Sequence, residues 1–260
     1  MSNFHIDLKR VVSIAKDAGK AIMEVYNTNF LVEYKKSESF EEGISPLTKA
    51  DKISDEIIAK GLKKIAPNIP ILSEETFEIP YKERKSWSLF WLVDSLDGTK
   101  SFIKKEGDFT VNIALISNKA PILGVVYAPF SDTLYYADAK GAYKQEKNNV
   151  AKLPINNKRK SFVVVASKNH FNDQTKKFIE DLKKQKENVE LVNIGSSLKF
   201  CLVAEGSADI YPRLGPTMEW DTAAAHAIVN TTGKKVYHYE TGEELVYNKE
   251  SLVNPFFVVK

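Results

Sequence analysis

The strongest constraint in this sequence is a short apolar run that leads directly into two aspartates. Residues 89–93 read LFWLV and continue into DSLDGT. The length and the aromatic content predict a buried strand, whose carboxyl end is where open α/β sheets commonly bind ligands. Neighbouring carboxylates repel each other unless a cation or a proton lies between them, and Mg²⁺ prefers oxygen ligands. The segment therefore predicts a metal site shared by Asp94 and Asp97, with Thr99 beside it and Gly98 allowing a sharp turn.

A simple turn explains the same hexapeptide equally well. Asp97-Gly98 is a common turn signal and is sufficient to end a strand. Because neither interpretation is favoured by these residues alone, the rest of the chain has to decide between them.

Composition and charge restrict the class of protein. The chain has 260 residues, of which 43% are hydrophobic, so it can build one large domain or two smaller ones. A net charge of +3 is too small to indicate nucleic acid as a partner. The single cysteine, Cys201, excludes an intrachain disulfide, and no secretory signal or membrane-spanning apolar stretch is evident, so we expect a cytoplasmic protein.

Apolar periodicity indicates helices and strands in both halves of the chain. Helices are predicted over residues 7–26, 48–65, 172–186, 197–205 and 219–230. Strands are predicted over residues 30–34, 71–72, 89–93, 109–117, 121–128, 133–137, 141–144, 162–166, 189–192, 209–211 and 256–259. The first half predicts two helices on an antiparallel sheet, and the second half alternates as an α/β layer.

Residues 147–160 are polar and show no periodicity, and we place a domain boundary there. The prediction is an N-terminal α+β domain over residues 1–153 and a C-terminal α/β domain over residues 154–260. On this division the first domain carries most of the metal ligands. The second carries the substrate-binding residues and the last metal ligand.

Further acidic residues stand at the ends of predicted elements. Glu74 and Glu75 follow a short strand and, taken alone, indicate a solvated loop. Asp51 follows Thr48 by three residues, which is typical of a capping box, and Asp221 begins a helix, where its charge suits the dipole. Taken together, acids delivered from several element ends suit a cluster of divalent cations. No P-loop, nucleophile elbow or dinucleotide fingerprint offers a competing site.

These residues belong to longer segments that resemble a known family. Residues 91–99 and 220–224 resemble the two signatures of the inositol monophosphatase-like, lithium-sensitive phosphatases. More segments are similar to the CysQ branch, the 3'(2'),5'-bisphosphate nucleotidases: residues 45–51, 72–75, 109–114, 121–127, 195–206, 211–213 and 215–217. The resemblance covers nearly the whole chain and implies an α+β fold, the layered α-β-α-β-α sandwich of inositol monophosphatase and fructose bisphosphatase.

The resemblance implies Mg²⁺ as cofactor, with two ions and room for a third, weaker ion near Glu74. The ligands it implies are, for the first ion, Glu74, Asp94 and the backbone carbonyl of Leu96, with Thr99 nearby, and, for the second, Asp94, Asp97 and Asp221. Bridging by Asp94 would place the ions about 3.5–4 Å apart, as in two-metal phosphoryl transfer. Ser95 stands where the family usually has proline, so we expect a looser turn and an altered metal affinity rather than an inactive site.

The implied catalytic residues are Asp51, Thr99 and Glu74. The Thr99 hydroxyl, oriented by Asp51, resembles the family's threonine-aspartate pair, which positions the attacking water and relays its proton. No covalent intermediate is required, because the water attacks phosphorus in line.

The implied substrate is 3'-phosphoadenosine 5'-phosphate, cleaved to AMP and phosphate in a reaction linked to sulfur assimilation. Ser196 and Lys199, at a helix start, are candidates to hold the second phosphate. The full set of implied substrate-binding residues is Gly98, Thr99, His170, Ser196, Lys199, Arg213 and Asp221. Lys199 and Arg213 are alternatively surface cations and His170 a loop residue, while His226, inside the last helix, is expected to be packed rather than catalytic.

Two other functions stay open at this point. An inositol monophosphatase or sugar phosphatase would share the metal site, although it needs no second anion pocket. A catalytically silent metal- or nucleotide-binding protein would have no need of the Asp51–Thr99 pair. The sequence does not distinguish a monomer from a homodimer, and it leaves open residual inositol phosphatase activity and loose attachment to the inner membrane.

Overall fold

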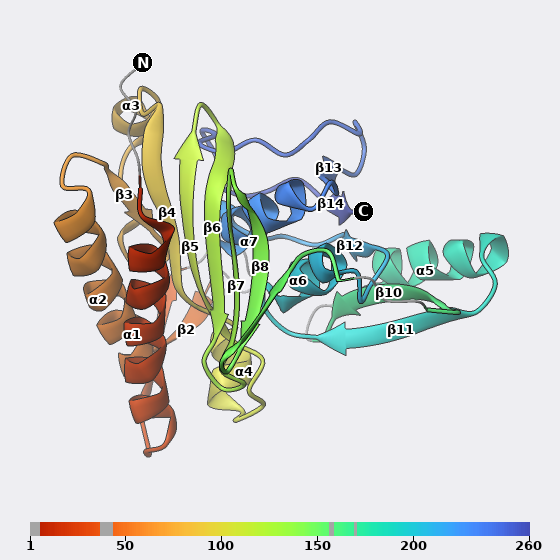
Figure 1. The fold of residues 1–260 in the computed structure, drawn as a ribbon, viewed down its shortest axis with the longest axis horizontal. Coiled ribbons are helices and arrows are strands. Elements are labelled where there is room, and N and C mark those ends of the chain that lie inside the picture. Colours follow the sequence, from red (N-terminus) through yellow and green to blue (C-terminus); the bar gives the residue numbers. More distant parts are fainter. Residues whose placement is uncertain (1–5, 37–43, 156–158, 169–170) are drawn as a thin grey trace.

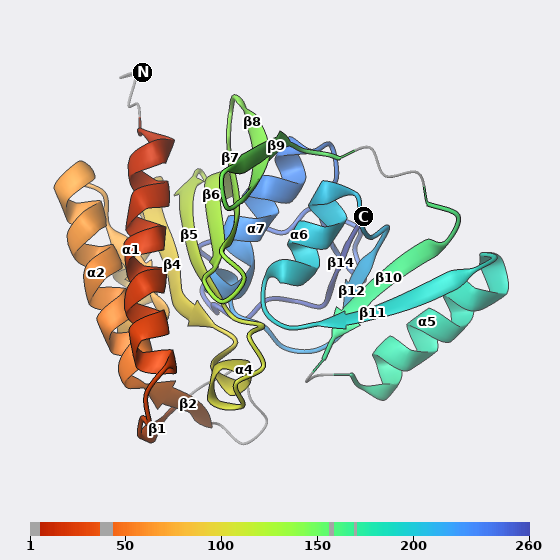
Figure 2. The same ribbon diagram turned by 60° about the horizontal axis from the view of Figure 1, so that its bottom comes forward.

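The chain folds into five layers that alternate helices and sheets, seen from two directions in Figures 1 and 2. This computed structural model describes residues 6–36, 44–155, 159–168 and 171–260. The first layer is the helix pair α1 (Leu8–Tyr26) and α2 (Lys49–Ile65). Both helices are capped at their starts, α1 by Asp7 and α2 by Thr48, and their apolar faces pack on the adjoining sheet.

The second layer is a seven-stranded sheet with the order β3-β4-β5-β6-β7-β8-β9. Only β3 and β4 run parallel, and the other neighbouring pairs are antiparallel. The strands are β3 (Ile71–Ser73), β4 (Leu89–Asp97), β5 (Thr110–Ser117), β6 (Ala120–Ala128), β7 (Thr133–Asp138), β8 (Gly141–Glu146) and β9 (Asn149–Lys152). In β4, Trp91 belongs to the core beneath α1 and α2 and Leu92 to the core on the other face. The strand is apolar without alternation because both of its faces are buried.

Two helices from the second half form the third layer, α6 (Leu198–Glu205) and α7 (Glu219–Thr231). Helix α7 packs against β4, β5 and β6, on the face opposite α1 and α2 (Figure 1). Gly124 in β6 makes the contact close, because a Cβ there would lie 2.0 Å from the Ala224 carbonyl oxygen. The division into domains 1–153 and 154–260 stays a prediction. Helix α7 belongs to the second of these domains but packs on the sheet of the first.

The fourth and fifth layers complete the sandwich. Strands β10 (Phe162–Ser167) and β11 (Val189–Ile194) pair in parallel, and β12 (Tyr211–Arg213), β14 (Phe257–Val259) and β13 (Val236–His238) form an antiparallel sheet. Helix α5 (Asp173–Gln185) covers them from outside, with Ile179 packed against Val164 and Val258 (Figure 2). The expected α+β sandwich with α-β-α-β-α layers is confirmed.

The remaining elements are short, and several were not predicted. They are β1 (Val32–Lys36) and β2 (Ile44–Thr48), paired antiparallel, the 3-10 turn η1 (Glu74–Thr76), α3 (Tyr81–Arg84) and α4 (Thr99–Ile103). The expectation of an irregular stretch over residues 147–160 is wrong at β9, an exposed edge strand that pairs with β8. Strand β13 was also missed.

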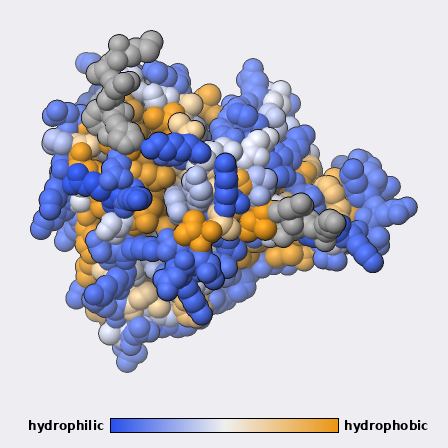
Figure 3. Space-filling model, in the orientation of Figure 1, coloured by the Kyte–Doolittle hydropathy of each residue, from blue (hydrophilic) through white to orange (hydrophobic). Residues whose placement is uncertain are grey.

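The outer surface is largely polar on the face seen in Figure 3, where hydrophilic residues dominate the end that carries α5. None of the helices in the described ranges is long and apolar enough to cross a membrane.

Candidate active site

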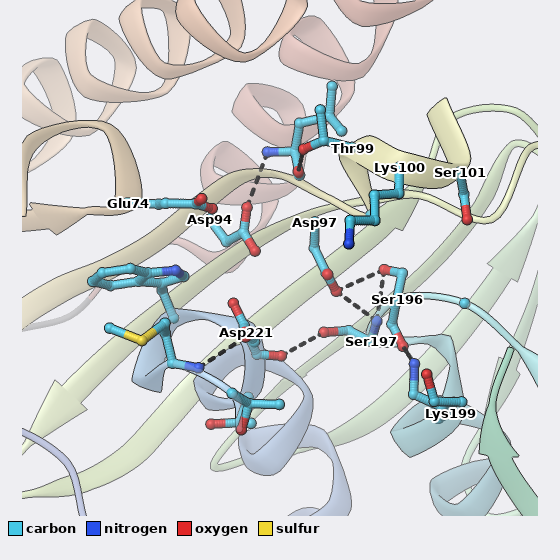
Figure 4. A pocket seen from close by; sticks show the side chains of 18 of the residues that line it. Glu74, Asp94, Asp97, Thr99, Lys100, Ser101, Ser196, Ser197, Lys199 and Asp221 are labelled. Atoms are coloured by element: carbon cyan, nitrogen blue, oxygen red, sulfur yellow. Dashed lines mark hydrogen bonds between the residues drawn. The ribbon is translucent and has the colours of Figure 1, made fainter. Parts of the chain in front are cut away.

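One pocket collects side chains from both halves of the chain (Figure 4). Its acidic side is formed by Glu74 from η1, Asp94 and Asp97 from β4, and Asp221 from α7. The β4–β5 pairing is irregular between Asp94 and Asp97, so the strand is distorted where it delivers these carboxylates. Gly98 follows with φ +96°, which favours glycine, and a Cβ at this position would lie 2.7 Å from the Asp108 carbonyl oxygen.

The carboxylates repel one another. Asp94 is buried, and Glu74, Asp97 and Asp221 are partly exposed. Burial raises the pKa of Asp94 well above its usual range, and the charges of Glu74, Asp97 and Asp221 raise it further. The pKa of Asp221 is raised by burial and then by Asp97 and Glu74. Oxygen ligands that share one pocket and destabilise one another's charge are a donor set that suits hard divalent cations.

Within the described ranges, no group of three or more His, Cys, Asp or Glu side chains is arranged to hold a metal ion as it stands. The donor chemistry therefore fits a divalent cation, while the coordination itself stays a prediction. Coordination by each ligand predicted from the sequence therefore stays a prediction, and so does coordination by the Leu96 carbonyl. That carbonyl accepts a hydrogen bond from the Thr99 hydroxyl at 3.3 Å.

Asp51 is both a helix cap and a partner of Thr99. Its Oδ2 accepts hydrogen bonds from the Thr48 backbone N–H and hydroxyl, each at 2.7 Å, which forms the expected capping box of α2. Its Oδ1 accepts a hydrogen bond from the Thr99 hydroxyl at 3.2 Å. Burial raises the pKa of Asp51 to about 6, although the Thr48 hydrogen bonds act in the opposite direction. The capping and the predicted functional contact use different oxygens of one carboxylate.

Ser95, which stands where proline was expected, ties β4 to α2. Its hydroxyl donates to the Asp51 carbonyl oxygen at 3.1 Å, and its own carbonyl accepts from the Ser54 hydroxyl at 2.7 Å. The next residue, Leu96, donates its N–H to Asp94 Oδ1 at 3.1 Å. These hydrogen bonds restrain the turn in place of a proline ring.

The opposite side of the pocket is basic. Lys199 is only 6% exposed, and burial lowers its pKa to about 8, with the Arg213 charge acting in the same direction and Asp97 against it. Lys199 Nζ donates to the Ser196 carbonyl oxygen. Arg213 is buried and donates to the Pro216 carbonyl oxygen at 2.7 Å, and its Nε finds no partner among the described residues. A buried, incompletely paired guanidinium beside a buried ammonium indicates an anion-binding site.

The alternative that Lys199 and Arg213 are surface cations is therefore wrong, because both side chains are buried. His170 lies outside the described residues, so its predicted role stays a prediction. His226 is packed as expected, fully buried between Tyr247 and Glu244.

Sequence reasoning missed Lys35 in β1. Its Nζ lies 2.9 Å from Glu74 Oε1 and 2.5 Å from Glu75 Oε1. Burial lowers its pKa, but the two carboxylates outweigh burial and raise the pKa overall. The solvated loop considered for Glu74 and Glu75 is also wrong, because both side chains are mostly buried and paired. No local sequence signal connects Lys35 with residues about 40 positions away.

Comparisons with known proteins agree with this geometry. A sequence profile of the inositol monophosphatase family matches residues 7–255, and the chain belongs to that family. Among its relatives, the 3'(2'),5'-bisphosphate nucleotidase CysQ of Salmonella typhimurium is 44% identical over 97% of this chain and 98% of its own length. The enzyme of the same name from Escherichia coli strain K12 is 43% identical over the same shares.

Solved structures lead to the same family. CysQ from Bacteroides thetaiotaomicron, a bacterial member of the inositol monophosphatase family, matches with a TM-score of 0.87 and 42% identity over 97% of this chain and 96% of its own. An inositol monophosphatase from Thermotoga maritima, 23% identical over 97% of this chain and 91% of its own, shares the fold with a TM-score of 0.74. The expected phosphatase class and the resemblance to the CysQ branch are confirmed, and enzymes of this family depend on metal ions.

Proposed function

We propose that the chain is a Mg²⁺-dependent, lithium-sensitive phosphatase that removes the 3'-phosphate of 3'-phosphoadenosine 5'-phosphate, giving AMP and phosphate. The observation that carries the proposal is one pocket with mutually repelling carboxylates on one side and the buried cations Lys199 and Arg213 on the other. Such a pocket suits a substrate with two separate phosphates, one reacting at the acidic side and one held at the basic side.

The acidic side is proposed to hold two Mg²⁺ ions, and Glu74 a third, weaker one. The proposed ligands are Glu74, Asp94 and the Leu96 carbonyl for one ion, and Asp94, Asp97 and Asp221 for the other. When bound, the ions would supply positive charge beside the phosphoryl oxygens and lower the pKa of a water molecule.

Thr99 and Asp51 are proposed to orient the attacking water. With the Thr99 hydroxyl 3.2 Å from Asp51 Oδ1, a water proton can pass to Thr99 as the Thr99 proton passes to Asp51. A pKa of about 6 leaves Asp51 mainly ionised at pH 7 to 8, in the form that accepts this proton. The Thr48 hydrogen bonds fix the other oxygen and so hold the carboxylate in place.

Ser196, Lys199 and Arg213 are proposed to hold the second phosphate, and Gly98, Thr99 and Asp221 to line the reacting end. A sulfur-assimilation role, a cytoplasmic location and a monomeric or homodimeric state accompany this proposal as predictions. In an inositol monophosphatase, no second phosphate of the substrate would pair with Lys199 and Arg213. Burying two unpaired cations costs free energy, so this function fits the pocket less well.

The test compares Lys199→Met with wild type on two substrates. We expect KM for 3'-phosphoadenosine 5'-phosphate to rise at least about tenfold, the worth of one charge-assisted hydrogen bond. KM for inositol 1-phosphate should change less than about threefold. Lys235→Met, which removes a lysine paired with Glu244, is the control and should leave both values unchanged. Equal effects of Lys199→Met on both substrates would contradict the proposed pocket.

A further inference from the structure

Ser197 joins the two halves of the acidic pocket. Its backbone N–H donates to Asp97 Oδ2 at 2.7 Å, and its hydroxyl donates to the Asp221 backbone carbonyl oxygen at 2.7 Å. Asp97 ends β4 and Asp221 lies in the first turn of α7, so one residue fixes the position of both carboxylate-bearing segments. Figure 4 shows Ser197 between them.

The Ser197 hydroxyl does not cap α6, although Ser197 is the N-cap residue of that helix. Serine at an N-cap normally accepts a hydrogen bond from its own helix. Ser197 is the N-cap of α6, yet within the described residues its side chain makes no capping hydrogen bond there. Instead its hydroxyl accepts from Asn112 Nδ2 at 3.0 Å and donates to Asp221. Its orientation is therefore set by β5 and by the pocket.

Asn112, in β5, holds Ser197 and Asp97 together by hydrogen bonds. It is 1% exposed, accepts a hydrogen bond from the Thr110 hydroxyl at 2.9 Å, and reaches Asp97 Oδ2 at 3.4 Å as well as Ser197. Because buried polar groups need hydrogen-bond partners, these three contacts restrain the Asn112 amide. The network leaves the Ser197 hydroxyl little freedom to rotate away.

The preceding residue connects this network to the basic side. The Ser196 hydroxyl donates to Asp97 Oδ2 at 2.7 Å, and the Ser196 carbonyl accepts from Lys199 Nζ. Ser196 has φ +56°, a left-handed conformation that costs a serine energy and persists because neighbouring contacts hold it. An anion that binds Lys199 or Ser196 therefore contacts the same short segment whose hydrogen bonds hold Asp97 and Asp221.

We propose that Ser197 is a positioning residue that couples occupation of the basic side by a nucleotide phosphate to the affinity of the acidic side for divalent cations. The inference rests on the proposed function. Because such coupling is reciprocal, the metal also tightens nucleotide binding by the same factor. Removing the hydroxyl should uncouple the two sides while leaving in place every charged residue proposed to contact the metal or the phosphate.

The test measures Mn²⁺ affinity of the metal-depleted full chain by electron paramagnetic resonance, without and with saturating AMP. For wild type we expect AMP to raise Mn²⁺ affinity at least about fivefold, the lower end of usual coupling. In Ser197→Ala the gain should fall below about twofold. Ser197→Thr, which restores a hydroxyl, should recover the gain. Thr231→Val is the matched control, because it removes a hydroxyl that donates to a carbonyl at the far end of α7, and it should keep the gain.

Asn112→Ala provides a second variant should Ser197→Ala fail to fold, and it should also reduce the gain. Wild-type coupling in both variants would overturn the positioning role, since direct contact between AMP and the metal would then explain the coupling. A wild-type protein that binds Mn²⁺ but no AMP would instead contradict the proposed nucleotide function, and with it this inference.

Discussion

Asp51 shows that a structural explanation of a residue does not exclude a functional one. Its Oδ2 completes the capping box of α2, and its Oδ1 accepts from the Thr99 hydroxyl. The capping holds the carboxylate in the orientation that the contact with Thr99 needs. The residue pair that predicts a cap thus also leaves the second oxygen of Asp51 free to accept from Thr99, which lines the pocket.

The Thr99 hydroxyl is the group on which the proposed water activation depends. We expect Thr99→Val to lower kcat for 3'-phosphoadenosine 5'-phosphate by about 100-fold or more, because proton relay is lost. Thr99→Ser keeps the hydroxyl and should stay within about tenfold of wild type by the same relay. Steady-state phosphate release at pH 8 distinguishes them, and an active Thr99→Val would remove Thr99 from the mechanism.

Lys35 is predicted to act as the counter-charge of Glu74 and Glu75 when no metal is bound. Lys35→Gln should lower the free energy of unfolding of the metal-free protein by about 1–3 kcal/mol, because charged hydrogen bonds are lost. It should also increase the stabilisation gained from Mg²⁺, because an ammonium no longer competes for Glu74.

Thermal unfolding with chelator and with Mg²⁺ measures both quantities. Lys52→Gln breaks the exposed pair between Lys52 and Glu33 and is the control, with little effect expected. A metal-free Lys35→Gln protein as stable as wild type would show that the lysine does not offset the carboxylates.

At the scale of elements, prediction succeeded where burial leaves a mark in the apolar pattern of the sequence. The helices 7–26 and 219–230 and the strand starting at residue 89 were found because their apolar residues face one or two cores. Strand β9 was missed because it is an exposed edge strand, so no apolar alternation marks it. Strand β2 holds only five residues and depends on pairing with β1 rather than on its own composition.

Helix α7 delivers Asp221 to the site, and Gly124 sets its distance from β6. Gly124→Ala should lower the free energy of unfolding by about 1–3 kcal/mol, because the new Cβ would meet the Ala224 carbonyl oxygen at 2.0 Å and push α7 away. Urea unfolding measures this. Gly215→Ala is the control, with its closest neighbour at 3.8 Å and an expected change within about 0.5 kcal/mol. Equal stability of both variants would contradict the close packing.

For the whole molecule, the sequence was enough to predict the acidic residues that the fold brings together, but not the contacts that organise them. Glu74, Asp94, Asp97 and Asp221 line one pocket as predicted. Lys35 and Asn112 were missed, because their partners lie far along the chain and no local pattern marks such contacts. Long-range polar contacts follow from the folded topology rather than from periodicity.

The metal-free protein should become less stable as pH rises. The folded state raises the pKa of three carboxyls that line the pocket, Glu74, Asp94 and Asp221. It also raises the pKa of Asp51, the partner of Thr99, to about 6. The folded state therefore binds more protons than the unfolded state, from about pH 4 up to the raised pKa values, and stability is lost across that window. His226, whose pKa burial lowers, opposes this below its ordinary value of 6.5, but it is a single group.

Thermal unfolding of the chelated protein at pH 5 and pH 7.5 measures this trend. We expect a lower midpoint at pH 7.5 and a smaller difference with Mg²⁺, which replaces protons between the carboxylates. Asp94→Asn should flatten the metal-free profile. A chelated protein more stable at pH 7.5 than at pH 5 would mean that the carboxylates do not repel one another as inferred.

The most direct test of the account is phosphate release by the wild-type protein with Mg²⁺ from 3'-phosphoadenosine 5'-phosphate and from inositol 1-phosphate, each with and without Li⁺. We expect kcat/KM to be at least about tenfold higher for the nucleotide, the worth of one further charged contact, and we expect Li⁺ to abolish that activity. A preference for inositol 1-phosphate would contradict the nucleotide assignment while leaving the metal site in place. No release from either substrate would contradict the proposed catalysis itself.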